Sequence, residues 1–127
     1  MDVIAAAHRE NKVRWFSNNG NADPSFSSTD INTGSDARSV HAADLNGNGH
    51  IDVVVADKDN NRVMWLENNG SQSFVQIIIK GNAWNARSVY AVDLDRDGDI
   101  DVISASESDD EISPKRSDSS FVALALL

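Results

Sequence analysis

Apolar residues along this chain come in short runs that alternate with clusters of small and polar residues. The runs are rich in β-branched or aromatic side chains and are separated by turn-forming residues, as is typical of strands. They lie at residues 40–43, 53–56, 63–66 and 74–79. Asn19-Gly20 and Asn69-Gly70 are hairpin signals, because both residue types tolerate positive φ. No long segment has helical periodicity, so the pattern predicts an all-β protein.

The same pattern recurs at a fixed period. Residues 13–20, Val-Arg-Trp-Phe-Ser-Asn-Asn-Gly, return as Val-Met-Trp-Leu-Glu-Asn-Asn-Gly at residues 63–70, an offset of 50. Residues 37–45, Ala-Arg-Ser-Val-His-Ala-Ala-Asp-Leu, return at residues 86–94 as Ala-Arg-Ser-Val-Tyr-Ala-Val-Asp-Leu, an offset of 49. A unit of about 49 residues that holds four strands is typical of a propeller blade and not of a helical repeat.

The period sets the expected organisation of the 127 residues. They amount to about two and a half four-stranded antiparallel blades, a partial β-propeller with loops between the strands. We expect an incomplete first blade at residues 1–36, a second at 37–85, and a third at 86–127 whose end diverges because Pro114 replaces the repeated tryptophan. Closed propellers have about four to eight blades. The expected partners are therefore further blades, from the same parent chain or from a homo-oligomer.

Two acidic loops separate strands of these units. Residues 44–52 read D-L-N-G-N-G-H-I-D and residues 93–101 read D-L-D-R-D-G-D-I-D, and both fit D-x-[DN]-x-[DN]-G-x-x-D. Oxygen ligands at alternate positions can converge on one hard cation, and calcium takes about six to eight oxygens. The ten candidate ligands are Asp44, Asn46, Asn48, His50 and Asp52 in the first loop and Asp93, Asp95, Asp97, Asp99 and Asp101 in the second. His50 and Asp99 are expected to offer main-chain carbonyl oxygens.

The sequence thus predicts two calcium sites. Neither loop is an EF-hand, because Val55 and Ser104 stand where the glutamate at the twelfth position should be, and strand residues follow. A solvated turn is the alternative for one acidic loop, but two copies at the same place in a repeat favour calcium. Magnesium fits less well, since it keeps several waters in an octahedral shell. The second loop has more carboxylates, so we expect it to bind calcium more tightly.

Composition narrows the function classes. The chain has 11 Lys and Arg against 20 Asp and Glu, a net charge of −9, which disfavours nucleic acid and favours cations. Seven of the 20 acidic residues lie in the two loops. The absence of cysteine excludes disulfides and thiolate metal sites. No apolar run reaches the roughly 20 residues of a membrane span, and no signal peptide is visible at the start.

No catalytic motif stands out, so we expect no enzyme activity. The chain has no G-x-S-x-G elbow, phosphate-binding loop or H-E-x-x-H pair. The repeated Trp15 and Trp65 are expected to pack between blades instead of stacking on a sugar. Trp84 lies in a polar loop and is either structural filler or a ligand platform. Arg38 and Arg87 are expected to pair with a neighbouring blade, the alternative being an anion clamp.

These loops, with the Val-x-Trp-[FL]-x-Asn-Asn-Gly and Ala-Arg-Ser-Val-x-Ala-x-Asp segments, resemble FG-GAP or VCBS repeats. The resemblance covers residues 2 to about 111, and the VCBS-type variant fits better because the literal Phe-Gly and Gly-Ala-Pro signatures are missing. It implies a calcium-binding β-propeller, like the integrin α-subunit head, whose calcium loops join the first two strands of a blade. It also implies extracellular or cell-surface placement and a role in adhesion or in carbohydrate or protein binding. Two alternatives remain: an accessory propeller of a secreted carbohydrate-active enzyme, or a self-assembling extracellular structural protein.

Overall fold

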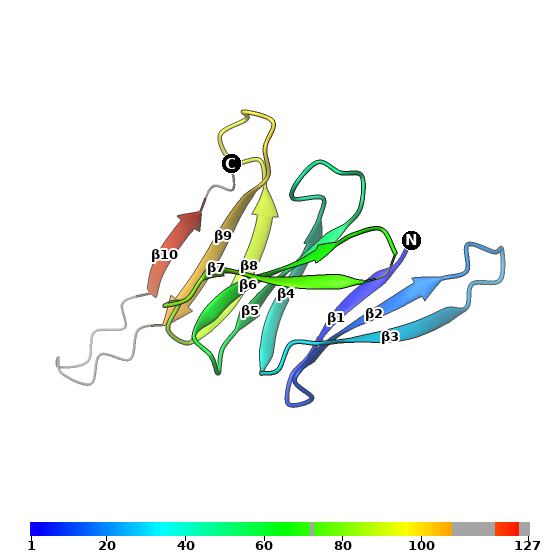
Figure 1. The fold of residues 1–127 in the computed structure, drawn as a ribbon, viewed down its shortest axis with the longest axis horizontal. Helices are drawn as coiled ribbons and strands as arrows, with labels where there is room; N and C mark the ends of the chain where they lie inside the picture. The colour runs from blue at the N-terminus through cyan, green and yellow to red at the C-terminus, as the bar shows by residue number, and fades with distance from the viewer. Residues whose placement is uncertain (72, 108–118, 125–127) are drawn as a thin grey trace.

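The chain forms ten β-strands in three antiparallel sheets (Figure 1). The computed structural model describes residues 1–71, 73–107 and 119–124. The strands are β1 (Val3–Ala7), β2 (Lys12–Asn18), β3 (Phe26–Asn32), β4 (Ala37–Ala43), β5 (Asp52–Asp57), β6 (Arg62–Asn68), β7 (Phe74–Lys80), β8 (Ala86–Val92), β9 (Asp101–Glu107) and β10 (Ser119–Leu124). Helix is absent from these residues, as predicted, and with it any helix long and apolar enough to cross a membrane.

The sheets follow one another along the chain. The first has the order β1-β2-β3, the second β4-β5-β6-β7 and the third β8-β9-β10. Every apolar run predicted as a strand is confirmed and extends by one to three residues. In the part of the chain that the structure describes, the three sheets fan out without closing a ring (Figure 1). The expectation for Pro114 falls outside the described residues, and β10 lies near the end of the expected third blade.

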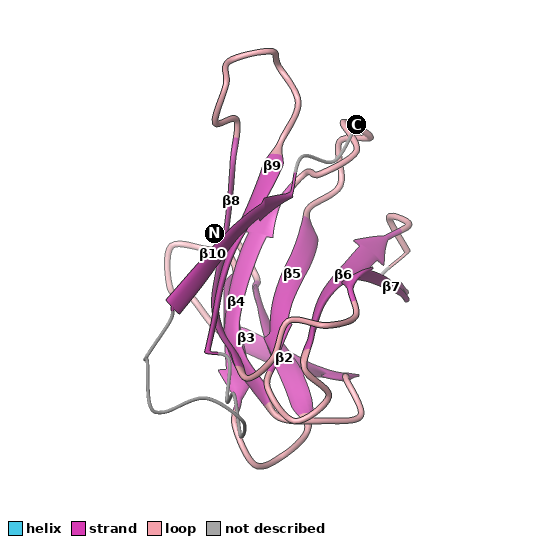
Figure 2. Ribbon diagram, turned by 90° about the vertical axis from the view of Figure 1, so that its left-hand side faces the viewer, coloured by secondary structure: helices cyan, strands magenta, loops and turns pink. Residues whose placement is uncertain are grey.

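The middle sheet is the core, because both of its faces are covered (Figure 2). All six residues of β5 are buried. Val54 packs toward the third sheet in a cluster with Val89 and Val102. Val55, on the opposite face of the strand, packs toward the first sheet with Val13. This arrangement explains why β5 is a continuous apolar run instead of an alternating one.

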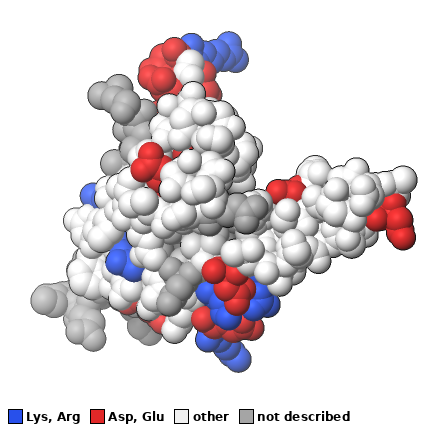
Figure 3. Space-filling model, turned by 45° about the vertical axis from the view of Figure 1, so that its right-hand side comes forward, with Lys and Arg blue, Asp and Glu red and all other residues white. Residues whose placement is uncertain are grey.

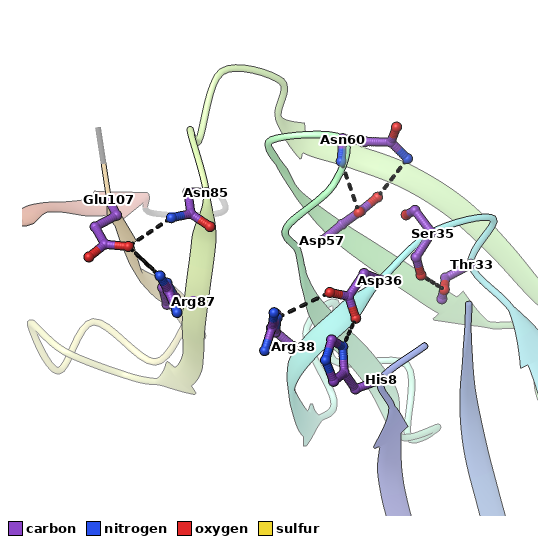
Figure 4. Close-up of polar contacts among 10 residues, drawn as sticks. All are labelled: His8, Thr33, Ser35, Asp36, Arg38, Asp57, Asn60, Asn85, Arg87 and Glu107. Atoms are coloured by element: carbon purple, nitrogen blue, oxygen red, sulfur yellow. Dashed lines mark hydrogen bonds and ion pairs between the residues drawn. The ribbon is translucent and has the colours of Figure 1, made fainter. Parts of the chain in front are cut away.

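Polar contacts join the first and second sheets at the end opposite the acidic loops (Figure 4). His8, in the β1–β2 turn, contacts the carboxylate of Asp36, which precedes β4. Arg38 Nε lies 3.1 Å from the same carboxylate. Burial raises the pKa of Asp36, but the hydrogen bond with His8 and the charge of Arg38 outweigh burial and hold the pKa below its usual value. Asp36 thus stays charged and ties the two sheets together.

Each of the two repeated arginines has an acidic partner in the described part of the chain. Arg38 pairs with Asp36 at the entrance to its own strand, and Arg87 Nε, on β8, donates to Glu107 of the adjacent β9 at 3.0 Å. Asn85 Nδ2 donates to the same glutamate at 2.7 Å (Figure 4). The partner described for Arg87 therefore lies in its own sheet and not in a neighbouring blade, whereas the partner of Arg38 is the last residue of the expected first blade. Strand pairing places Glu107 beside Arg87, whereas Asp36 precedes Arg38 by only two residues in the chain.

The tryptophans behave largely as predicted. Trp15 meets Phe74 of the second sheet edge to face, with ring centroids 6.3 Å apart. Trp65 packs against the cluster between the second and third sheets. The packing interpretation of both residues is confirmed. Trp84 lies between β7 and β8 and is 59% exposed, which leaves both interpretations of it open.

Candidate metal centre

Both acidic loops lie at one end of the molecule. The first connects β4 to β5 and the second connects β8 to β9, and Figure 1 draws both at the top. Acidic side chains gather at the top of the space-filling view in Figure 3, at the height of the β8–β9 connection. Strand order produces this placement, because corresponding hairpins of successive sheets turn at the same end.

The second loop brings three carboxylates together. Ligand atoms of Asp93, Asp95 and Asp101 all lie within 4.8 Å of one another. Calcium binds oxygens at about 2.3–2.6 Å, so ligands on opposite sides of the ion are about 5 Å apart. The three carboxylates therefore fit around one calcium ion. Asp101 is 8% exposed and Asp95 is exposed, so the cluster opens to solvent on one side.

Main-chain donors hold these carboxylates in place. The two oxygens of Asp93 accept hydrogen bonds from the main-chain N–H groups of Arg96, at 2.6 Å, and Gly98, at 3.1 Å. Asp101 accepts one from Leu94 at 3.0 Å. Each acid thus folds the loop back on itself, and these hydrogen bonds help to gather the carboxylate oxygens.

The first loop repeats this geometry with fewer charges. Asp44 accepts a hydrogen bond from Gly49 N at 2.8 Å, as Asp93 does from Gly98, and Asp52 accepts one from Leu45 N at 3.2 Å. Among the residues that the structure describes, the second loop alone gathers three or more acidic or histidine ligands so closely. Amides stand at the third and fifth positions of the first loop, so its donor set is mostly neutral.

Left-handed backbone shapes both loops at two positions. Gly49 and Gly98, at the sixth position, have φ of +86° and +101°. Gly47 and Arg96, at the fourth position, have φ of +69° and +67°. An arginine in this region is strained, because its Cβ crowds the backbone. The sequence pattern identified the sixth position but missed the fourth, since an arginine there gives no glycine signal.

Several predicted ligands lie beside the triad and outside it. The side chains of Asp97 and Asp99 are exposed, and Asp97 Oδ1 accepts a hydrogen bond from Asp99 N at 2.9 Å. In the first loop, Asn48 Oδ1 accepts one from His50 N at 2.8 Å. The fifth-position side chain thus positions the seventh residue in both loops. The imidazole of His50 points toward the β6–β7 turn, where a Cβ added at Gly70 would lie 2.5 Å from its Nε2.

Residues of β6 complete the first loop, and sequence reasoning missed them. Asn46 Nδ2 donates to Glu67 Oε1 at 2.9 Å. Asn68 N donates to Asp52 Oδ1 at 2.8 Å. The repeat carried a partial signal, because an asparagine equivalent to Asn68 recurs as Asn18, while Glu67 is replaced by Ser17 in the first copy.

The repeated loops and strands match a known sequence family. The FG-GAP-like repeat matches residues 1–55 and 44–104, most of the chain. This protein belongs to the FG-GAP-like repeat family. No curated protein and no solved structure matches the chain significantly. Each matched segment of this FG-GAP-like chain includes the first acidic loop, and the second match continues through the second loop.

The contact between His50 and Gly70 leads to the first prediction. Gly70→Ala and Gly20→Ala should each lower the free energy of unfolding by about 1 kcal/mol, because both glycines have positive φ. Only Gly70→Ala should also displace the His50 imidazole, since an added Cβ at Gly20 has no atom within 4 Å. Urea unfolding measures the first effect and the NMR shifts of the His50 ring protons the second. Unchanged ring shifts in Gly70→Ala would contradict the described contact.

Proposed function

We propose that this FG-GAP-like chain is a calcium-binding, non-enzymatic segment of a β-propeller. Each sheet corresponds to one blade, and each acidic loop joins the first two strands of its blade. The observation that carries the proposal is the triad of Asp93, Asp95 and Asp101, whose ligand atoms come within 4.8 Å of one another. The family membership supports the same reading. Calcium is favoured because the donors are all hard oxygens and include no cysteine.

Calcium would stabilise the second loop by compensating its like charges. Carboxylates held this close repel one another, and a divalent cation among them replaces that repulsion with attraction. A ligand that binds only the folded state stabilises that state in proportion to the logarithm of its concentration over its Kd. The proposed role of the ion is therefore structural: it orders the loop and links β8 to β9.

The first loop is proposed to hold a second calcium ion. Asp44, Asn46, Asn48 and Asp52 would supply side-chain oxygens, and His50 its main-chain carbonyl. Support comes from the backbone, which turns at the same two positions as in the second loop, and from the equivalent hydrogen bonds to the first and ninth residues. The smaller charge of this donor set makes the proposed site the weaker one.

The proposed setting is extracellular or at the cell surface, in adhesion or in carbohydrate or protein binding. It follows from the family resemblance, and the acidic surface is compatible with it. The described sheets do not close into a ring, which favours further blades from the parent chain or from other copies as partners. Strand edges left unpaired promote such association.

Calcium titration with thermal melting tests the proposed function. Two calcium ions should bind, and the melting temperature should rise with calcium and fall when a chelator is added. Isothermal calorimetry gives the number of sites, and circular dichroism gives the melting temperature. An unchanged melting temperature together with no heat of binding would refute a structural calcium site.

Substitutions at the fifth positions test the predicted order of affinities. Asp97→Ala should weaken calcium binding more than Asn48→Ala, because it removes a charge as well as an oxygen. Calorimetric titration of both variants and the unmodified chain provides the comparison. The reverse order would contradict the argument from ligand charge.

Association is testable by sedimentation. With calcium present, the 13.8-kDa chain should sediment at a multiple of that mass, and the larger species should shrink as the protein is diluted. Analytical ultracentrifugation from about 5 to about 200 μM covers the range of weak assembly. A single monomeric species throughout would exclude homo-oligomeric completion and leave the parent chain as the source of further blades.

A further inference from the structure

A carboxylate outside the loop motif reaches the first acidic loop. Glu67 stands on β6, 21 residues from Asn46, and its Oε1 accepts a hydrogen bond from Asn46 Nδ2 at 2.9 Å. The side chain of Glu67 is half-buried, whereas that of Asn46 is exposed. Glu67 therefore adds a negative charge beside the loop, in addition to the charges of the loop's own nine residues.

This contact fixes the orientation of the Asn46 amide. With its nitrogen held by Glu67, the amide directs its oxygen back into the loop, where Oδ1 accepts a hydrogen bond from Asn48 N at 3.2 Å. A flipped amide would set its oxygen against the Glu67 carboxylate and turn its N–H groups toward the loop. Two acceptors facing each other are unfavourable, so Glu67 selects the orientation in which Asn46 presents an oxygen.

The second loop has no need of such a partner. Asp95 occupies the equivalent third position, and both atoms at the end of a carboxylate are acceptors. The second loop also has Asp97 where the first has Asn48. An acid on β6 beside the first loop therefore compensates for the amide in the loop, both in orientation and in charge.

We infer that Glu67 is a positioning residue of the first calcium loop, orienting Asn46 and adding a third carboxylate charge beside Asp44 and Asp52. This inference rests on the proposed function, since it assigns Glu67 a role toward the ion proposed for that loop. It makes calcium affinity at the first loop depend on a strand residue that the loop motif does not include.

Two substitutions separate charge from orientation. Glu67→Gln keeps an oxygen that can accept from Asn46 but removes the charge, and should raise the calcium Kd of the first loop about threefold. Glu67→Ala removes both the accepting oxygen and the charge, and should raise the calcium Kd of the first loop about tenfold. Calcium titrations followed by NMR report each loop separately, through the amides of Gly47 and Gly49 for the first and Gly98 for the second. The Kd of the second loop should not change.

A matched control and a double-mutant cycle make the test specific. Glu10→Ala removes the same charge from a surface group that pairs with Lys12 and Arg14 in the first sheet, and should leave both loops unchanged. In an Asn46→Asp background both terminal atoms of the third-position side chain are oxygens, so its orientation no longer matters. Glu67→Ala should then raise the calcium Kd of the first loop by clearly less than tenfold. Melting of each variant in chelator shows that the fold is retained, and Glu67→Gln serves if Glu67→Ala does not fold.

The outcomes separate the two hypotheses. If the unmodified chain binds no calcium at either loop, the proposed function fails and the inference fails with it. If the unmodified chain binds calcium but the Kd of the first loop is the same in Glu67→Ala and Glu10→Ala, only the inference is wrong. The inference would also be overturned if Glu67→Ala lowered the calcium affinity of the first loop equally with asparagine and with aspartate at position 46. The effect would then not act through the Asn46 amide.

Discussion

The structure depends on a buried carboxylate at the point where each acidic loop enters its strand. Asp52 is fully buried, and its two oxygens accept main-chain hydrogen bonds from Leu45 at 3.2 Å and from Asn68 at 2.8 Å. A carboxylate can be buried in this way only when hydrogen bonds replace the water it has lost. Asp52 thereby connects the start of the loop, the start of β5 and the end of β6.

Parts of this connection recur in the other two sheets, at Asp101 and at Asp2, which stands 50 residues before Asp52. Asp101 accepts from Leu94 N at 3.0 Å, as Asp52 does from Leu45. Asp2 accepts from Asn18 N, as Asp52 does from Asn68, and its other oxygen accepts from the Trp15 indole at 3.0 Å. The hydrogen bond from Asn18, followed by that from Trp15, holds the pKa of Asp2 below its usual value. The ninth residue is thus a structural anchor as well as a candidate ligand.

Much of this fold follows from the sequence because a repeat constrains it twice. Each strand of the middle sheet is supported by its own β-branched residues and by an equivalent strand about 49 residues away. The two loops were located for the same reason, and the structure gathers three predicted ligands of the second loop. Positions shared by the copies are the ones that sequence reasoning can recover.

The sequence did not reveal the contacts and backbone conformations that differ between the copies. The partner of Arg38 is Asp36, while Arg87 uses Glu107, which lies on the paired strand 20 residues away. The same bulge precedes Ser39 and Ser88, so strand register does not cause the difference. The difference follows from a substitution, because Asn85 stands where the other copy has Asp36. The strained Arg96 escaped notice because its conformation is imposed by the turn and not by its own preference.

The difference between the loops then has a physical meaning. A loop with carboxylates at every side-chain position gathers strong ligands, but their mutual repulsion opposes folding when no cation is bound. The first loop, with amides at two positions, avoids much of that repulsion and draws on Glu67 of β6 for an additional charge. The charge around this loop is therefore spread over two elements of the sheet, and the orientation of its Asn46 ligand depends on the β5–β6 pairing. Binding at this loop would then depend on the middle sheet as well as on the loop itself.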